Sequence, residues 1–293
     1  MSITIGIPFF NAEAYLGDAI RSVFAQTYQD WELILVDDGS TDRSLEIALS
    51  INDPRVRVLS DGCNRKLPFR LNQVTSEAQY DLIGRMDADD LISPTRFEKQ
   101  VAILNAHPEI DLVTTGVCSI TNDNRPVGIR CGFPDDSITG RKLLQGQCAI
   151  VHAAILGRKS WFMRNRYDET AMLTEDYELW LRAFSHNDFR LHIQNEPLYY
   201  YREENNATAE KLLTAYRNQV ELIKKYGYLG FNRFELGSII AKFRCKSIVV
   251  RLLDLLNKTD VLLKKRNTPI ADDSLLQHFN QEIDQILQTR LPQ

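Results

Sequence analysis

The first hundred residues alternate short apolar runs with amphipathic segments, and each apolar run stops at a cluster of polar turn residues. Runs of this length predict buried strands, and the segments between them carry apolar residues at helical spacing. The expected strands are 2–8, 31–36, 56–59 and 81–86, and the expected helices are 12–26, 44–50, 71–79 and 96–106. Such alternation predicts a parallel, doubly wound sheet. Ligands of these α/β sheets bind at the carboxyl edge of the strands.

The signals change twice further along the chain. After a strand at 110–117, residues 118–147 are rich in Gly, Pro, Asn and Asp and predict a loop or an excursion from the sheet. An apolar strand at 148–156, a helix at 174–183 and one or two strands within 190–201 follow. Beyond these the pattern is helical only, at 207–226, 233–257 and 272–289. We therefore expect one domain over residues 1–204 and an all-helical appendage over 205–293.

Charge and cysteine content exclude several classes of protein. The net charge of −4 argues against general nucleic-acid affinity. The five cysteines are odd in number and widely spaced, which favours buried thiols in a reducing cytosol over a disulfide or zinc framework. The N-terminus has no signal-peptide pattern, and no apolar run approaches the ~20 residues that span a bilayer. We expect a cytoplasmic protein that is soluble or lies on a membrane.

A cluster of carboxylates, Asp87-Ala88-Asp89-Asp90, follows the apolar run that ends at residue 86. Three carboxylates this close repel one another unless a cation or a proton lies between them. Oxygen-rich clusters suit Mg²⁺ or Mn²⁺, especially where a phosphate supplies further ligands. The segment therefore indicates a metal-dependent enzyme that acts on a phosphorylated substrate.

Two earlier turns are candidates for nucleotide binding. Asp38 lies in VDDGSTD after the second strand, where it is either part of a polar turn or an acceptor of hydrogen bonds from a nucleoside. Phe10 lies in the loop after the first strand, where it either packs in the core or stacks on a base. No G-x-G-x-x-G or G-x-x-x-x-G-K-[ST] follows the first strand, so a dinucleotide fold and a P-loop are disfavoured.

Taken together and in order, these segments resemble the family 2 glycosyltransferases, which are inverting enzymes of the GT-A fold. The resemblance covers about residues 1–203. The matching strings are IGIPFFNAEAYLGDAIRSVFAQTYQDWELILVDDGSTD, RLNQVTSEAQYDLIGRMDADDLISPTRF and LTEDYELWLRA. It implies a Rossmann-like, mostly parallel sheet flanked by helices, with the helical region from 205 as an appendage outside the match.

The resemblance implies roles for individual residues on the donor side. The residues expected to contact the nucleotide-sugar are Pro8, Phe10, Asn11, Glu13, Asp38, Arg70, Asp87 and Ala88. Arg70 is displaced by one position from the arginine of the family pattern, and both Arg70 and its neighbour Lys66 are candidate partners of the diphosphate. Asp87 and Asp89 are the expected metal ligands, and Asp90 is interpreted as a helix cap or as support for the ligands.

The segment Thr174-Glu175-Asp176 has the composition of an ordinary helix start, with a threonine cap and acids at the positive end of the helix dipole. The resemblance makes Asp176 the catalytic base, with Glu175 orienting it or contacting the acceptor. On the acceptor side the candidates are His152, Trp180 and Arg202. His152 is equally well a histidine of the core. Trp180 is alternatively a core residue, and Arg202 is alternatively a contact to the diphosphate or metal.

The sequence thus predicts a Mn²⁺- or Mg²⁺-dependent inverting glycosyltransferase. It would move a hexosyl or N-acetylhexosaminyl group from a nucleotide-sugar to a glycan or lipid-linked glycan, in surface polysaccharide or glycoconjugate biosynthesis. UDP is the preferred nucleotide, with dTDP and GDP open. The alternatives are a non-catalytic nucleotide-sugar or glycan-binding module and a nucleotidyltransferase. A basic, apolar stretch over 239–266 is either a helix packed on the domain or a peripheral membrane contact.

Overall fold

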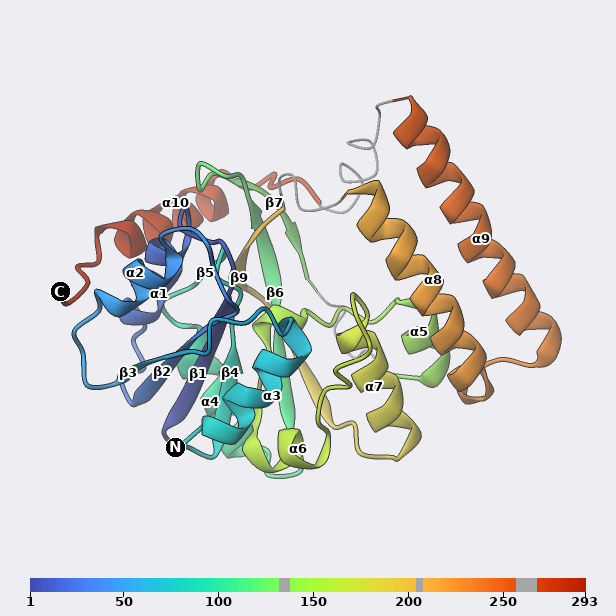
Figure 1. The fold of residues 1–293 in the computed structure, drawn as a ribbon, viewed down its shortest axis with the longest axis horizontal. Coiled ribbons are helices and arrows are strands. Elements are labelled where there is room, and N and C mark those ends of the chain that lie inside the picture. Colours follow the sequence, from blue (N-terminus) through green and yellow to red (C-terminus); the bar gives the residue numbers. More distant parts are fainter. Residues whose placement is uncertain (132–137, 204–207, 257–267) are drawn as a thin grey trace.

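The computed structural model describes residues 1–131, 138–203, 208–256 and 268–293, and these form a mixed sheet covered by helices (Figure 1). The strand order is β3-β2-β1-β4-β8-β6-β9-β5, with β7 paired to β6. Pairs among the first four strands are parallel, as is β6 with β9, whereas β8, β7 and β5 pair antiparallel. The strands are β1 Ile3–Phe9, β2 Trp31–Asp37, β3 Val56–Ser60, β4 Leu82–Arg85, β5 Leu91–Ile92, β6 Leu112–Ile120, β7 Pro126–Arg130, β8 Leu156–Arg158 and β9 Leu191–Arg202.

Helices connect the strands and cover the sheet. The helices of the first 203 residues are α1 Leu16–Phe24, α2 Ser44–Leu49, α3 Leu67–Glu77, α4 Arg96–Ala106, α5 Gly140–Gln145, α6 Lys159–Arg164 and α7 Glu175–Ser185. A short 3-10 helix, η1, spans His152–Ala154. The predicted parallel, doubly wound start of the chain is confirmed, because β1 to β4 form the parallel order β3-β2-β1-β4 with helices between them.

The strands of the parallel part read as continuous apolar runs because both faces are covered. Every residue of β1 and β2 is buried. Gly6 of β1 lets α3 approach closely, since a Cβ at Gly6 would lie 2.4 Å from a methyl group of Val74. Helix α3 therefore packs directly on β1, and the backbone N–H of Lys66 at the start of α3 donates to Asp38, just after β2.

The predicted strand over 148–156 is wrong for most of its length. Its residues lie on an irregular segment that includes η1, half-buried at 148–151 and buried from Ala153, and the strand β8 begins only at Leu156. The side chain of Thr114 replaces a strand partner, because its hydroxyl group bonds both the N–H and the carbonyl of Val151 at 3.1 Å. An apolar run indicates burial, and periodicity alone does not separate a buried strand from a buried turn.

The predicted excursion at 118–147 contains regular structure on both sides of residues 132–137, which lie outside the described residues. Strand β6 continues to Ile120, β7 pairs with it, and α5 follows. Thr139 caps α5 by accepting a hydrogen bond from the backbone N–H of Lys142.

The C-terminal helices lie in two different places (Figure 1). Helices α8 Ala209–Tyr226 and α9 Arg233–Leu255 form a hairpin beside α7, joined by the 3-10 helix η2 Gly227–Leu229. Helix α10 Asp273–Gln288 lies at the opposite end of the molecule, where Phe279, Ile283 and Ile286 pack against strands β5, β6 and β9. Among the described residues, no helix is both long and apolar enough to cross a bilayer.

Candidate active site

Two cavities adjoin at the carboxyl edge of the sheet, and Leu67, Leu173 and Glu175 line both of them. The first cavity, of about 300 Å³, lies beside the ends of β1 and β2. Its lining includes Pro8, Phe10, Asp38, Lys66 and Arg70. The second cavity, of about 560 Å³, lies beyond the end of β4. Its lining includes Arg85, Asp87, Arg130, His152, Glu175 and Asp176.

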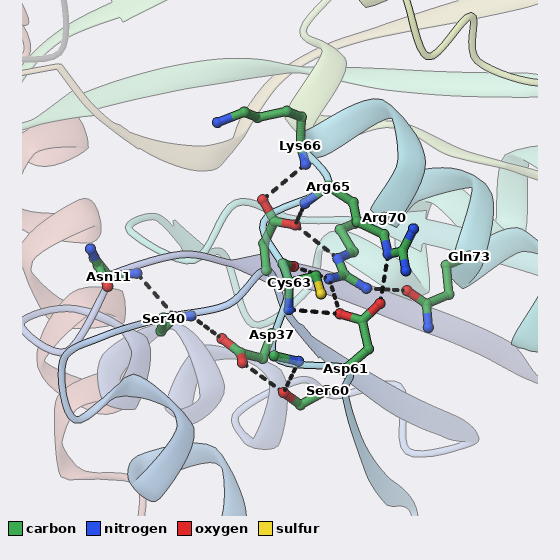
Figure 2. Close-up of polar contacts among 12 residues, drawn as sticks. Asn11, Asp37, Ser40, Ser60, Asp61, Cys63, Arg65, Lys66, Arg70 and Gln73 are labelled. Atoms are coloured by element: carbon green, nitrogen blue, oxygen red, sulfur yellow. Dashed lines mark hydrogen bonds and ion pairs between the residues drawn. The ribbon is translucent and has the colours of Figure 1, made fainter.

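Asp38 and Arg70 form a buried ion pair at the base of the first cavity. The Arg70 side chain is 0% exposed, and its Nε donates to Asp38 at 2.9 Å. The rest of the guanidinium group bonds Asp61 at 2.6 Å and Gln73 at 2.8 Å (Figure 2). The Arg70 guanidinium group also holds the pKa of Asp61 below its usual range.

The Asp38 carboxylate also fixes the loop that leads into α3. It accepts hydrogen bonds from the backbone N–H groups of Arg65 at 2.7 Å and Lys66 at 3.1 Å (Figure 2). Lys66 therefore enters α3 with a φ of 73° and an exposed side chain on the cavity. In this arrangement Arg70 positions Asp38 and the loop, whereas Lys66 presents an exposed side chain to the cavity. The predicted contacts of Asp38 and Arg70 with a donor stay predictions.

Phe10 is placed to contact a ligand, whereas three other predicted donor contacts lie outside both cavities. Phe10 is 49% exposed and lines the first cavity together with Pro8. Asn11 and Glu13 accept hydrogen bonds from the backbone N–H groups of Thr41 and Arg43, at 2.8 and 2.9 Å, and so join the loops after β1 and β2. Ala88 is buried in the core. Asn11 adopts a φ of 49°, a conformation that asparagine tolerates.

The carboxylate cluster after β4 divides into supporting and accessible members. Asp90 is buried and accepts hydrogen bonds from the Tyr199 hydroxyl group at 2.8 Å and the Arg202 N–H at 2.7 Å. Burial, with the charges of Asp89 and Asp87, raises the pKa of Asp90 well above its ordinary value. Asp87 and Asp89 are only partly buried. Asp90 thus supports the loop, as one of the two interpretations from the sequence has it.

Arg202 holds the same loop from the end of β9. Its guanidinium group donates to the backbone carbonyls of Asp89 at 2.7 Å, Thr121 at 2.7 Å and Asn122 at 2.8 Å, and lies over the ring of Tyr15. The side chain is buried and lines neither cavity. The geometry makes Arg202 a clamp on the cluster, and its predicted contact with an acceptor is not tested.

The donor set around Asp87 and Asp89 suits a hard cation that brings ligands of its own. No group of three or more His, Cys, Asp or Glu side chains converges as a metal site within the described ranges. Asp87 instead forms an ion pair with Arg85 at 2.6 Å. One or two carboxylates completed by substrate phosphates are the usual ligands of Mg²⁺. The residues therefore fit a cation that arrives with a diphosphate, and they do not fit a preformed, all-protein site.

Glu175 and Asp176 begin α7, at the junction of the two cavities. Burial, reinforced by the neighbouring Asp176, raises the pKa of Glu175 to about 7. Burial also raises the pKa of Asp176, although Arg85 opposes the rise. Carboxyl groups with pKa values shifted toward neutrality are suited to accepting a proton from a substrate. The helix start thus supplies two carboxyl groups of the kind that general base catalysis requires.

The residues before α7 aim this pair at the cavities. Leu173 has a φ of 61°, an uncommon conformation for a leucine, and its side chain lines both cavities. The expected threonine cap is wrong, since the Thr174 side chain makes no capping hydrogen bond. Its φ of −147° and ψ of 19° depart from the extended backbone of an N-cap residue.

Comparison with known proteins identifies the family. The sequence model described as glycosyl transferase family 2 matches residues 4–165. The chain belongs to this family. EpsE of Bacillus subtilis (strain 168), which is named as a glycosyltransferase, is 33% identical over 220 residues, with 73% of this chain and 77% of EpsE covered. The O-antigen biosynthesis glycosyltransferase WbnJ of Escherichia coli is 29% identical over 220 residues, with 73% of this chain and 84% of WbnJ covered.

Solved structures show that the fold is of the GT-A type. TarS residues 1–349 of S. aureus, in complex with UDP-GlcNAc, has a TM-score of 0.61 at 18% identity, covering 83% of this chain and 71% of that one. The mannosyltransferase PcManGT of Pyrobaculum calidifontis, in complex with GDP-Man and Mn²⁺, has a TM-score of 0.57 at 14% identity, covering 97% and 84%. The predicted fold class, a GT-A sheet flanked by helices with a C-terminal helical region, is confirmed.

Of the two acceptor candidates His152 and Trp180 in this family 2 chain, His152 lines the second cavity and Trp180 lies in the core. His152 lines the second cavity from η1, not from the expected strand, and its Nε2 lies 2.8 Å from the Tyr167 hydroxyl group. Burial, together with Arg85, lowers the pKa of His152 well below its ordinary value, so the ring stays neutral. Trp180 packs behind it, against His152, Trp161 and Phe189. The alternative that Trp180 is a core residue is therefore the one that fits.

Arg85 is the site residue that the sequence interpretation missed. It is buried at the end of β4, pairs with Asp87 and lines the second cavity together with the two acids of α7. Among the residues that the structure describes, none accepts a hydrogen bond from its Nε. Burial opposes its charge, yet Asp87, together with Tyr167 and Tyr199, raises its pKa. The available signal was one arginine within the otherwise apolar run LIGRM.

Proposed function

We propose that the chain is a metal-dependent inverting glycosyltransferase that transfers a sugar from a UDP-sugar to a hydroxyl group of a glycan or lipid-linked glycan. The observation that carries the proposal is the meeting of the two cavities at Glu175. Pro8, Phe10 and Asp38 line the first cavity, and the carboxyl pair of α7 and Asp87 line the second. A donor in one cavity and an acceptor in the other would meet beside Asp176.

The roles follow from the surroundings of each side chain. Phe10 and Pro8 would contact the nucleoside, and exposed Lys66 would contact the diphosphate. Asp87 and Asp89 would hold a divalent cation, which stabilises the charge of a departing diphosphate as a Lewis acid. Asp176 would take the proton of the acceptor hydroxyl group as that oxygen attacks the anomeric carbon. Inversion needs one such base and no covalent intermediate, in parallel with inverting glycoside hydrolysis.

Arg85 would hold the base in its active form. Because the guanidinium group is buried among acids, it opposes the rise in the pKa of Asp176. The neutral His152 beside it would offer a hydrogen-bonding nitrogen to an acceptor hydroxyl group without adding charge. Both residues line the second cavity, in which the acceptor would bind.

The names and bound ligands of related proteins support the proposed donor and acceptor. WbnJ is named for O-antigen biosynthesis, a polysaccharide pathway. Among the structural neighbours, TarS was solved with UDP-GlcNAc and PcManGT with GDP-Man and Mn²⁺. These neighbours favour UDP with a hexosyl or N-acetylhexosaminyl group and a Mn²⁺ or Mg²⁺ ion, with GDP as the next donor to examine.

The test is a panel of nucleotide-sugars, read by release of the nucleoside diphosphate with Mn²⁺, with Mg²⁺ and with chelator. We expect one donor to be turned over, with the activity lost in chelator and in Asp176→Asn. Asp273→Asn, which removes an exposed charge from α10, is the matched control and keeps the activity. Binding of a nucleotide-sugar without turnover of any donor would instead assign the chain to the non-catalytic alternative.

A further inference from the structure

Helix α9 is apolar on two opposite faces. One face packs inward through Ile239, Phe243 and Val250. Helix α8 packs along one side of α9, Arg141 of α5 pairs with Glu235 at its start, and the opposite face of α9 is turned to solvent (Figure 1). From Ala241 onward its outward apolar residues recur every three or four positions, as one face of a helix requires, and Phe234 lies on the same face two turns earlier. This outer stripe consists of Phe234, Ala241, Cys245, Ile248, Leu252 and Leu255.

The outer stripe exposes large side chains. Phe234 is 92% exposed and Leu255 is 81% exposed, and Val249 and Leu256 widen the stripe toward the end of the helix. Isolated apolar residues are ordinary on a protein surface, but a continuous apolar stripe marks an interaction site. Nothing in the packing of the hairpin requires it, since the inner face already supplies the contacts with α8.

Basic side chains border the outer stripe on both sides. On one side Arg244 and Arg251 of α9, with Arg217 of α8, line a groove of about 260 Å³. None of these three arginines forms an ion pair with a carboxylate in the part of the chain that the structure covers. On the other side Lys242 and Lys246 line a second groove of about 220 Å³. Burial, together with the neighbouring Lys242, lowers the pKa of Lys246.

We propose that this surface binds the anionic face of a lipid bilayer. Helix α9 would lie in the plane of the headgroups, with the outer stripe among the acyl chains and the two basic borders on lipid phosphates. The charges decide against a second copy of the chain, because self-association would bring Arg244 and Arg251 against the like charges of the other copy. The basic residues beyond α9, at 258–266, lie outside the described residues, and the proposal does not depend on them.

Docking in this way would fix the active site relative to the membrane. Helix α8 packs against α7, whose first residues are Glu175 and Asp176. The hairpin is thus a rigid connection from the proposed membrane surface to the proposed base. The inference concerns binding alone, so it is tested without substrate and does not depend on the proposed sugar transfer.

The test is flotation of the full-length protein with vesicles of phosphatidylcholine and with vesicles that contain phosphatidylglycerol as well. We expect binding to the anionic vesicles that weakens with added salt. Arg244→Gln with Arg251→Gln should weaken that binding roughly thirtyfold, at about 1 kcal/mol for each basic residue near the surface. Ile248→Asp with Leu252→Asp should weaken it by at least about tenfold, through loss of apolar burial.

The control is Leu49→Asp with Val127→Asp, which places the same two charges at exposed apolar positions away from α9 and should bind as the wild type does. Circular dichroism melting confirms that each variant is folded. The proposal is overturned if the wild type ignores anionic vesicles, binds neutral ones equally well, or still binds after Ile248→Asp with Leu252→Asp. Self-association of the wild type in the absence of vesicles, lost in that same variant, would assign the surface to a second copy and also overturn it.

Discussion

Replacing Glu175 with glutamine should stabilise the fold, and by an amount that grows with pH. The pKa of this carboxyl group rises from 4.5 to about 7 on folding, because burial and the neighbouring Asp176 disfavour its charged form. A rise of this size corresponds to about 3 kcal/mol at full ionisation. Because Glu175 is partly open to solvent in the cavities, screening reduces the expected effect to about 1.5–3 kcal/mol.

The pH dependence has a definite sign. Below about pH 4.5 the carboxyl group is protonated in both the folded and the unfolded chain, so its contribution to the free energy of unfolding does not change with pH. Between pH 4.5 and about 7 the folded state binds more protons, and the free energy of unfolding therefore falls as the pH rises. Above about pH 7 the destabilisation is complete. Because glutamine does not ionise, Glu175→Gln removes this fall in the free energy of unfolding.

The assay is thermal and urea unfolding of the wild type and Glu175→Gln at pH 5, 6, 7 and 8, in chelator and without nucleotide. We expect the smallest difference at pH 5, about a quarter of the full effect, and a variant more stable by about 3–6 °C at pH 8. Glu210→Gln, on the exposed first turn of α8, is the control and should show a much flatter dependence on pH. A difference that is constant with pH, or a variant less stable at pH 8, would refute the reasoning.

Three further outcomes are expected. Arg70→Met should lower the free energy of unfolding by about 3 kcal/mol, because it leaves Asp38 buried without its partner, and urea unfolding measures this. Arg65→Met, whose partner Asp61 is exposed, should cost under about 1 kcal/mol, and equal losses would contradict the argument. Gly6→Ala should destabilise by about 1–3 kcal/mol through its clash with Val74, and an additional Val74→Ala that rescues nothing would contradict that cause. Asp89→Asn should raise the Mn²⁺ concentration needed for half-maximal turnover at least about tenfold, and an unchanged titration would remove Asp89 from the metal site.

The sequence predicts the order of the elements and the end of the sheet at which the polar side chains gather. It does so because strands buried on both faces leave long apolar runs and because the polar turns follow them directly. Asp87 and Glu175 are far apart in the chain, and only the family pattern indicates that they line one cavity. The roles that the pattern gives the catalytic candidates stay predictions, and residue type alone could not separate Asp90, which supports the loop, from Asp89.

What the sequence could not supply are contacts between distant side chains. The ion pair of Arg70 with Asp38 depends on how α3 meets β2, and nothing in the residue spacing encodes it. The irregular segment around His152 follows from one hydroxyl group, that of Thr114, which takes the hydrogen bonds of a missing strand partner. The amphipathic pattern of α10 predicts a helix with one buried face, but it does not say that this face packs on β5, β6 and β9.

The position of α10 has a consequence for how the protein is made. Strands β5, β6 and β9 leave Leu91, Cys118 and Tyr200 without cover until Phe279, Ile283 and Ile286 pack against them. During synthesis those apolar side chains therefore emerge from the ribosome long before the helix that covers them. The nascent chain therefore passes through a stage in which these strands have been synthesised but their apolar side chains are exposed. Chaperone binding at that stage, followed by release when residues 273–288 appear, is the route that this order of events favours.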